Sequence, residues 1–313
     1  MRAATIRDGK VLVEEHPDPE PGTGQVLVRV RAAGVNGADM MQLRGRYPAP
    51  PGSPPDIPGL ELAGEVVGLG AGATRFAEGD RVMGIVGGGG QAELAVVHER
   101  QLTPVPDAVA FPAAGGLPEV FTTAHDALFT QGALRPGERL LVHGAAGGVG
   151  TAAVQLAHAV GARVTATVRN PDARDAVEQL GADDVIEPDG FEERGPFDVV
   201  LELVGAPNLA ANVKALNDGG RIVVIGIAAG AKAELNLAAL MAKRGRIMAS
   251  TLRARPLEQK AATARALERE VLPGFERGTL QVPVAETFAL AAVAAAYERF
   301  AAGGKVGKVI LEP

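Results

Sequence analysis

Cysteine is the first residue type that this sequence lacks, and its absence removes two kinds of chemistry. The 313 residues include no cysteine and no tryptophan. Without cysteine, neither a disulfide nor a metal site built on thiolate ligands can form. Histidine is also scarce, and its positions show no close spacing of the kind that zinc ligands need. They are His16, His98, His125, His143 and His158. The sequence therefore predicts no bound metal.

Runs of positive charge and long apolar runs are missing as well. The formal net charge is −6, and Lys and Arg form no dense cluster. A nucleic-acid surface needs clustered cations to displace counterions, so we expect no nucleic-acid partner. No window of about 20 residues is apolar enough to span a bilayer, and the N-terminal segment has no apolar signal core. We therefore expect no membrane association and, by default, a cytoplasmic location.

Aromatic residues make up only 4% of the chain, and two of them are tyrosines. Tyr47 lies in the Gly- and Pro-rich stretch GVNGADMMQLRGRYPAPPG, residues 34–52, shortly after Asn36 and Asp39. Asp39 is predicted to cap a short helix over MMQLRG. Tyr47 and Asn36 are candidates for a functional role. The alternatives are that Tyr47 packs against the Pro-rich segment 48–58 and that Asn36 is a turn amide that satisfies its own backbone.

The chain is long enough for two domains with a large core. Residues 1–110 have a β-rich pattern, in which QVLVRVRAAG alternates Val26, Val28 and Val30 on one face, as a half-buried strand does. More apolar segments follow at short intervals, separated by turns that contain glycine. This pattern predicts a small β-barrel or coiled sheet.

Near residue 112 the pattern changes to buried Val- and Ile-rich strands that alternate with helices. Such alternation is typical of a doubly wound parallel sheet, so the predicted fold class is α/β. The tail, residues 280–313, reads as strand, helix and strand, and it is expected to return to the first domain. We therefore predict a β-rich domain from residues 1–115 and 276–313 and a nucleotide-binding domain from residues 116–275.

A glycine-rich loop, HGAAGGVG, follows the apolar run Leu140–Val142 and precedes an amphipathic helix. It contains the G-x-G-x-x-G pattern with Ala145 in the first position. Gly147 would let the backbone approach a pyrophosphate, and Gly150 would let the helix pack closely on the strand. Free N–H groups at the start of the helix would bind phosphate. An ordinary turn is the alternative, but the surrounding strand, helix and strand favour a dinucleotide site. Its predicted loop contacts are Ala146, Gly147, Gly148, Val149 and Gly150.

The end of the next strand predicts which nucleotide binds. NAD-preferring sites carry an acidic residue there, which binds the ribose 2′-hydroxyl. Here Val168 occupies that position and Arg169 follows. Arginine suits a 2′-phosphate, whereas a carboxylate would repel it, so the prediction is NADPH. The predicted ligands are Arg169, Asn170 and Arg174. The alternative is that these arginines form a solvated helix start.

Several stretches together resemble the zinc-free quinone oxidoreductases of the medium-chain dehydrogenase/reductase superfamily. They are AGVNGADMMQLRGRY, PGLELAGEVVGLG, GGGGQAELAVV, PEVFTTAHDAL, LLVHGAAGGVGTAAVQLA and GKVGKVIL, and they extend through most of the chain. GLPEVFTTA and STLRAR are similar to the branch that contains the p53-inducible quinone oxidoreductase. The resemblance implies a GroES-like catalytic domain, a Rossmann NADPH-binding domain and a homodimer. RIVVIGIAAGAKAELNL is a candidate edge segment for that dimer.

The zinc alcohol dehydrogenases of the same superfamily have cysteine where this chain has Asn36 and histidine where it has Leu60. The glycines at 87–90 also run directly into QAELA, without a four-cysteine zinc lobe. The resemblance therefore implies hydride transfer to acceptors that need no Lewis acid, namely quinones and related α,β-unsaturated carbonyls. Tyr47 would donate a hydrogen bond to the developing oxyanion, and Asn36 would donate to the substrate or hold the nicotinamide ribose.

Further cofactor contacts are implied position by position. Thr123 would face the phosphates near the nicotinamide, and Lys308 would reach a phosphate. The remaining implied contacts are Val204, Gly226, Ile227 and Leu252. One departure concerns the 2′-phosphate, which several relatives bind with Ser, Lys and a later Tyr. Pro188 occupies roughly the Tyr position here, so Arg169 and Arg174 would have to substitute.

The predicted function is thus an NADPH-dependent reductase of small-molecule quinones or enones. One alternative is an enoyl-thioester reductase, which would need a long acyl groove and a basic patch for the thioester carrier, and the sequence shows no such patch. Another is a nucleotide-binding redox sensor, or a crystallin-like or RNA-binding relative with little turnover. The intact segment 34–47 favours an enzyme.

Overall fold

A computed structural model describes all residues 1–313, and they divide into two compact units. The first unit comprises Met1–Thr122, Leu252–Gly303 and Lys308–Pro313, and the second comprises Thr123–Thr251 and Gly304–Gly307. Residues 252–275 therefore belong to the first unit, although the sequence pattern grouped them with the nucleotide domain. The physical reason is that helix α8 (Leu257–Ala266) packs against strand β7 (Leu102–Pro104).

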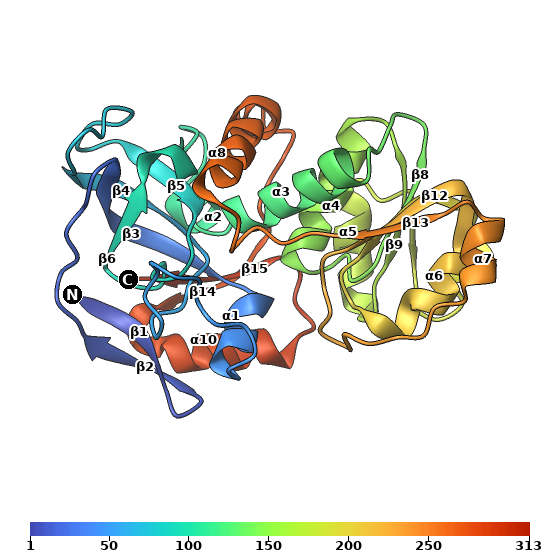
Figure 1. Ribbon diagram of the computed structural model, residues 1–313, viewed down its shortest axis with the longest axis horizontal. Coiled ribbons are helices and arrows are strands. Elements are labelled where there is room, and N and C mark those ends of the chain that lie inside the picture. The colour runs from blue at the N-terminus through green and yellow to red at the C-terminus, as the bar shows by residue number, and fades with distance from the viewer. The chain divides into compact units, whose positions relative to one another are not determined.

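The first unit is built on a seven-stranded sheet with the order β14-β15-β3-β4-β5-β7, in which β6 also pairs with β3 (Figure 1). Its further strands are β3 (Gln25–Val35), β4 (Glu61–Leu69), β5 (Arg81–Ile85), β6 (Leu94–His98), β14 (Val284–Ala289) and β15 (Lys308–Glu312). Strands β1 (Arg2–Arg7) and β2 (Lys10–Glu15) form a separate antiparallel hairpin. The helices besides α8 are α1 (Gly37–Leu43), α2 (Phe111–Ala114), α9 (Leu272–Glu276), α10 (Val293–Ala302) and the part of α3 (Pro118–His125) up to Thr122.

Strand β3 shows why the predicted alternation forms a sheet with one buried face. Val26, Val28 and Val30 are at most 2% exposed and lie in one hydrophobic cluster, whereas Arg29 and Arg31 between and after them are exposed. The strand has antiparallel partners on both sides, β4 and β6. The β-rich architecture of this unit is confirmed.

The second unit is a six-stranded parallel sheet with the order β10-β9-β8-β11-β12-β13. The chain runs outward from β8 through β9 to β10 and then returns to β11, so the strand order reverses between β8 and β11. The strands are β8 (Arg139–Val142), β9 (Arg163–Thr167), β10 (Asp184–Ile186), β11 (Phe197–Glu202), β12 (Leu216–Val224) and β13 (Arg246–Ala249). The helices are α4 (Gly148–Ala159), α5 (Arg174–Gln179), α6 (Leu209–Ala215) and α7 (Leu237–Ala242). The predicted doubly wound Rossmann sheet is confirmed, and such sheets bind ligands where the order reverses.

One expectation about this sheet is wrong. The segment RIVVIGIAAGAKAELNL was a candidate for the sheet edge, but its strand part belongs to β12, which lies between β11 and β13. Arg246–Ala249 adds one more parallel strand, pairing with Arg221–Val224, and so β13 is the edge.

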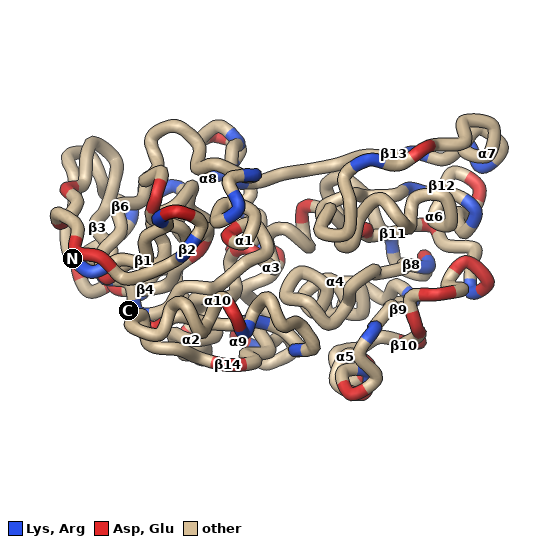
Figure 2. Tube along the Cα trace, turned by 90° about the horizontal axis from the view of Figure 1, so that it is seen from below, with Lys and Arg blue, Asp and Glu red and all other residues tan.

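Two properties of the whole chain bear on its partners. None of its helices combines the length and the apolar composition that crossing a membrane requires. In Figure 2, Lys and Arg are interspersed with Asp and Glu along the chain of each unit.

Candidate active site

The glycine-rich loop of the second unit joins β8 to α4, as its pattern predicted. Gly147 is the N-cap of α4 and has an extended backbone, with φ −72° and ψ 167°. A Cβ atom on Gly150 would lie only 2.6 Å from the Cα atom of Ala145, so glycine is required for the close contact between helix and loop. The first N–H groups of a helix have no partner within it. The loop therefore fits a pyrophosphate, for which Ala146–Gly150 would supply backbone donors.

A short segment near the C-terminus closes on this loop. The N–H of Gly307 donates to the carbonyl of Ala146 at 2.9 Å, and Gly307 forms an isolated bridge with Gly147. The side-chain amide of Asn170 donates to the carbonyl of Gly304 at 3.0 Å. Gly304–Gly307 thus contacts both predicted parts of the nucleotide site. The sequence did not reveal this, because the contacts join positions far apart in the chain.

His143 begins a buried hydrogen-bond network beneath the loop. It is 1% exposed, its Nε2 lies 2.8 Å from Asn212 Oδ1, and its Nδ1 lies 3.2 Å from Thr167 Oγ1. Burial lowers the pKa of His143, against the charge of Glu202, so the imidazole is neutral at neutral pH. His143 connects the ends of β8 and β9 to α6 and packs within the unit rather than binding a metal.

Glu202 completes the network at the end of β11, where it is 2% exposed. Its Oε1 accepts the N–H groups of Val204 and Gly205 at 2.7 and 2.8 Å, and its Oε2 accepts the amide of Asn212 at 2.7 Å. These bonds fix the turn after β11 at the edge where a nucleotide binds. Sequence reasoning missed Glu202, although an acidic residue within the apolar run VVLELVG was a usable signal.

The residues predicted to bind the 2′-phosphate differ in their contacts. Arg169 follows β9 and is exposed. Asn170 accepts the N–H of Asp172 at 3.2 Å and caps a short 3₁₀ turn, Pro171–Ala173. Arg174 pairs with Glu187 at 2.9 Å. Arg169 is thus the exposed cation of this group, whereas Asn170 and Arg174 are engaged with the protein itself.

The other implied cofactor contacts fall in different units. Thr123, Val204, Gly226 and Ile227 lie in the second unit, and Leu252 and Lys308 lie in the first. Thr123 Oγ1 is buried without a hydrogen-bond partner, which a bound cofactor would supply. Gly226 has no room for a side chain, because a Cβ would lie 2.1 Å from the carbonyl oxygen of Leu203. Ile227 is 40% exposed.

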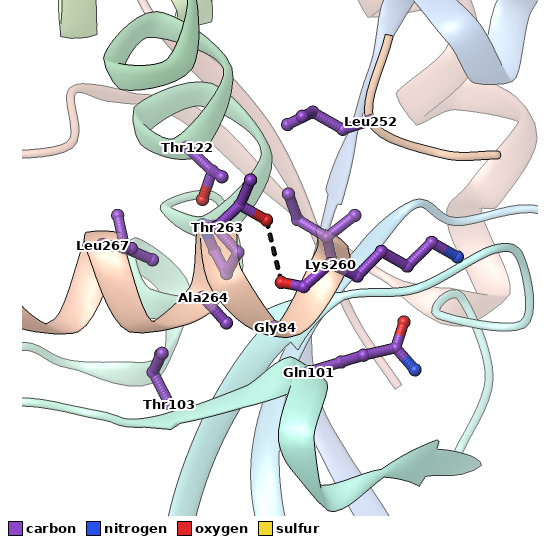
Figure 3. A pocket seen from close by; sticks show the side chains of 11 residues that line it. Gly84, Gln101, Thr103, Thr122, Leu252, Lys260, Thr263, Ala264 and Leu267 are labelled. Atoms are coloured by element: carbon purple, nitrogen blue, oxygen red, sulfur yellow. Dashed lines mark hydrogen bonds between the residues drawn. The ribbon is translucent and has the colours of Figure 1, made fainter. Parts of the chain in front are cut away.

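Leu252 lines a small cavity of the first unit, which Figure 3 shows in close view. The cavity has a volume of about 20 Å³, which is room for about one water molecule. Helix α8 forms one wall through Thr263 and Ala264, and the Thr263 hydroxyl donates to the carbonyl of Lys260 at 2.8 Å (Figure 3). As it stands, the cavity is too small for a quinone.

Helix α1 of the first unit begins at a capping box formed by Asn36 and Asp39. The backbone N–H of Asn36 donates to Asp39 Oδ2 at 2.8 Å, and that of Gly59 donates to Asp39 Oδ1 at 3.0 Å. Asp39 is fully buried, and burial raises its pKa to about 6, against these two N–H bonds. Asp39 therefore caps the helix as predicted, but from within its first turn, because the helix begins at Gly37 with Asn36 as its N-cap.

A buried ion pair lies directly beside Asn36. Lys308 Nζ is 2.7 Å from Glu61 Oε1, and these side chains are 3% and 0% exposed. The ammonium also donates to Asn36 Oδ1 at 2.6 Å and to the carbonyl of Val35 at 3.1 Å. The Asn36 amide donates to Glu61 Oε1 at 2.9 Å and to the carbonyl of Gly34 at 3.3 Å. The polar atoms of Asn36 and Lys308 are therefore engaged within the first unit, and their contacts with a substrate or phosphate stay predictions.

A metal does not fit this set of side chains. Asn36 offers an amide that already has partners, Leu60 is apolar and 1% exposed, and the ammonium of Lys308 contacts the oxygens of both Asn36 and Glu61. No group of three or more His, Asp or Glu side chains in the chain is placed to hold a metal ion.

Tyr47 follows α1 and is half-buried under an arginine that sequence reasoning missed. The guanidinium of Arg253 lies 5.1 Å from the centre of the Tyr47 ring and donates to the Tyr47 carbonyl at 3.0 Å. It also donates to Gln42 Oε1 at 2.6 Å and to the carbonyl of Gly87 at 2.8 Å. Burial raises the pKa of Tyr47, and the charge of Glu119 adds to this, so the phenol keeps its proton at neutral pH. Arg253 fixes the loop that carries Tyr47.

Glu119, in the first turn of α3, is a second residue that the sequence did not single out. Its backbone N–H donates to Glu61 Oε2 at 2.8 Å. Its own Oε2 is buried and has no hydrogen-bond partner. Burial, and then the charge of Glu61, raises the pKa of Glu119 to about 8. A glutamate at the start of a helix is usually solvated there, which is why its position alone gave no signal.

Comparisons with known proteins match two family domains to this chain. Residues 22–107 match the alcohol dehydrogenase GroES-like domain, and residues 148–268 match the zinc-binding dehydrogenase family. The chain is 33% identical to the quinone oxidoreductase of Mus musculus over 307 residues, which cover 94% of this chain and 90% of that protein. It is 30% identical to the solved quinone oxidoreductase of Pseudomonas syringae pv. Tomato DC3000, with a TM-score of 0.85 and coverage of 100% of this chain and 99% of that one.

A further relative is far longer than this chain. The polyketide synthase GfsB of Streptomyces halstedii is 42% identical over 208 residues, which cover 65% of this chain. The matched part is 4% of that protein's length.

Proposed function

This chain belongs to the medium-chain dehydrogenase/reductase superfamily, and on that premise we propose that it is an NADPH-dependent reductase of quinones and related α,β-unsaturated carbonyls that works without a metal. The observation that carries the proposal is the ion pair of Lys308 and Glu61 beside Asn36. Asn36 stands where the resemblance places a cysteine ligand in the zinc alcohol dehydrogenases, and here its amide oxygen accepts the Lys308 ammonium at 2.6 Å. Without a Lewis acid, the acceptor must already be activated, as quinones and enones are.

The two units would contribute different parts of the reaction. NADPH, when bound, supplies a hydride. The loop Ala146–Gly150 would hold its pyrophosphate, and Thr123 Oγ1 would gain the partner that it lacks. Tyr47 would donate a hydrogen bond to the acceptor oxygen on which negative charge develops. No hydrogen bond within the protein engages the Tyr47 hydroxyl, so it is free to donate.

The direct test is NADPH consumption with 1,4-benzoquinone and 9,10-phenanthrenequinone, compared with trans-2-enoyl thioesters. We expect turnover with the quinones and little with the thioesters. Turnover with the thioesters alone would favour the second candidate, an enoyl-thioester reductase, which the match to a polyketide synthase supports. NADPH binding without turnover of any acceptor would favour a nucleotide-binding sensor and contradict both enzymes.

Tyr47→Phe tests the proposed donor. Loss of a hydrogen bond to a developing oxyanion lowers kcat by about 100-fold or more, and we expect kcat/KM to fall accordingly while the Kd for NADPH stays the same. The matched control is Tyr297→Phe, which removes the hydroxyl of the other tyrosine, a buried group that donates to Gln91 at 2.9 Å. That control should lower stability by about 1 kcal/mol and leave kcat/KM unchanged. Full activity of Tyr47→Phe would remove Tyr47 from the mechanism.

Arg169→Ala tests the preference for NADPH. A charge-assisted hydrogen bond contributes about 1.5–3 kcal/mol, so the Kd for NADPH should rise by about tenfold or more while that for NADH stays the same. Arg174→Ala should have a smaller effect, because Arg174 pairs with Glu187. Arg244→Ala is the charge-matched control, since Arg244 pairs with Asp218 on the surface. Equal or better kcat/KM with NADH in the unaltered protein would contradict the preference.

We also propose a homodimer that pairs at the open edge of β13. Leu237 and Met241 of the neighbouring helix α7 are 64% and 77% exposed, which leaves apolar surface near that edge. Met241→Glu should shift the protein toward the monomer in light scattering. An unaltered mass would exclude this surface.

A further inference from the structure

Three carboxyl groups of the first unit, those of Asp39, Glu61 and Glu119, interact electrostatically, and their partners differ. Both oxygens of Asp39 accept backbone N–H groups, from Asn36 and Gly59. Glu61 accepts the Lys308 ammonium, the Asn36 amide and the Glu119 N–H. By contrast, Oε2 of Glu119 is buried and has no partner. Two of these groups are therefore held as acceptors, and the third has no donor or cation at that oxygen.

The charges around Glu119 determine which carboxyl group keeps a proton. Glu61 from β4 and Asp39 from α1 disfavour its ionised form, whereas Lys308 from β15 and Arg253 favour it. Lys308 is bonded to Glu61, and Arg253 is bonded to Gln42 and two backbone carbonyls. Neither cation therefore offsets the cost of burying an ionised Glu119 carboxylate. Burial and the neighbouring carboxylates raise the pKa of Glu119 to about 8, so it is neutral at pH 7. Environments that push the pKa values of neighbouring carboxyl groups apart are typical of acid–base sites.

We propose that Glu119 supplies the proton that the acceptor takes up together with the hydride. The inference rests on the proposed reductase function. A two-electron reduction requires one hydride and one proton per acceptor. The hydride that NADPH would supply forms a new bond to hydrogen on the acceptor, and the π electrons of the acceptor shift onto its carbonyl oxygen. The O–H bond of Glu119 then breaks, and a new O–H bond forms on that oxygen. Glu119 is left as a carboxylate and takes up a proton from water, which part of the residue reaches.

Tyr47 and Glu119 would have separate roles in this step. Their charges influence each other, since the charge of Glu119 raises the pKa of Tyr47. A phenol with a raised pKa is a poor source of a proton at neutral pH, but it remains a good hydrogen-bond donor. Tyr47 would therefore stabilise the oxyanion, and Glu119 would neutralise it.

The test compares Glu119→Gln with the unaltered protein, using 1,4-benzoquinone as the acceptor. Glutamine keeps the size of the side chain but has no acidic proton. We expect kcat to fall by about 100-fold, because positioned general acids contribute 10²- to 10⁴-fold, and the Kd for NADPH to stay within about twofold. The unaltered protein should lose kcat/KM as the pH rises through about 8, where Glu119 ionises, and Glu119→Gln should lack this decrease. Glu119→Asp should restore part of the rate.

Two further measurements separate the possible failures. Infrared spectra should show a neutral carboxylic acid band at pH 7 that Glu119→Gln removes, and no such band would overturn the proposal whatever the activity. The surface control Glu258→Gln breaks the exposed pair with Arg100 and should leave kcat unchanged. If the unaltered protein reduces quinones and Glu119→Gln keeps its kcat, Glu119 is not the proton source, although the proposed function stands. If the unaltered protein reduces no acceptor, the proposed function fails, and this inference fails with it.

Discussion

Each unit of the molecule has a buried glutamate at the centre of a polar network. The two glutamates differ in their partners, which are neutral donors in one unit and include a cation in the other. Glu202 of the second unit is bonded to backbone N–H groups and to a neutral amide. Glu61 of the first unit is bonded to an ammonium, and a second glutamate lies beside it. Both carboxylates are at most 2% exposed.

The kind of partner determines what each buried carboxylate does to its surroundings. A carboxylate whose partners are neutral donors fixes the backbone around it, as Glu202 fixes the turn at Val204 and Gly205. A carboxylate paired with a cation fixes a charge as well, and any further carboxyl group nearby must stay neutral or bear the cost of repulsion. The second network thus holds the backbone around it in one geometry, and the first leaves Glu119 as the group that we propose to supply the proton.

The largest expected effect comes from breaking the charged network of the first unit, which consists of Glu61, Lys308 and Asn36. Lys308→Met would leave Glu61 buried without its cation, and removing one member of a buried pair costs about 3–5 kcal/mol. We expect urea unfolding to show this loss. The double variant Glu61→Gln with Lys308→Met should recover part of it, because no unpaired charge remains. The surface variant Arg244→Met should cost less than about 1 kcal/mol. An equally small loss for Lys308→Met would show that the ion pair does not stabilise the first unit.

A smaller effect is expected from weakening the neutral network of the second unit, in which Glu202 is bonded to Asn212 and Asn212 to His143. Glu202→Gln keeps the shape of the side chain but weakens hydrogen bonds to a charged acceptor, which costs about 2 kcal/mol. Because these bonds fix the turn beside the nucleotide site, the Kd for NADPH should rise as well. Glu258→Gln, a change of the same type in an exposed pair with Arg100, is the control. If NADPH binding is unchanged in Glu202→Gln, the network does not position the ligand.

The second unit could be predicted from the sequence because its signals are local. The strand, glycine loop and helix at residues 140–159 are contiguous, and each glycine has a steric reason that its spacing reveals. The exception was the sheet edge. Nothing in the segment at residues 221–237 showed that Arg246–Ala249 would pair with it and become the outer strand.

The first unit was predicted in outline only, because its site joins distant residues. Asn36 and Lys308 are 272 positions apart, and Gln42 and Arg253 are 211 apart. Three residues that the sequence flagged here, Asn36, Asp39 and Tyr47, lie in one short stretch that resembles a known family. Lys308 was flagged as well, but for a phosphate contact and not for its pairing with Glu61. Arg253 and Glu119 gain their roles only from neighbours that folding brings together, so no local pattern marked them.

The smallest expected effect is a pH dependence that only the charged network should show. The pKa of Glu119 is about 8 in the folded protein and lies near the ordinary glutamate value of 4.5 in the unfolded chain. Between these values the folded state binds more protons, so stability is highest at the acidic end of the window and falls as the pH rises. Each pH unit should cost at most about 1.4 kcal/mol.

The measurement is the free energy of unfolding in urea at about pH 6.5 and about pH 7.5, a range above the pKa of Asp39, which is about 6. The unaltered protein and the surface control Glu258→Gln should both lose about 1 kcal/mol over this range. Glu119→Gln should lose much less, because the titrating group is gone. The lowered pKa of His143 places its titration below this range, so the neutral network should add no slope. An equal slope in all three proteins would mean that Glu119 is already ionised at pH 6.5, and the contrast between the two networks would then lose its physical basis.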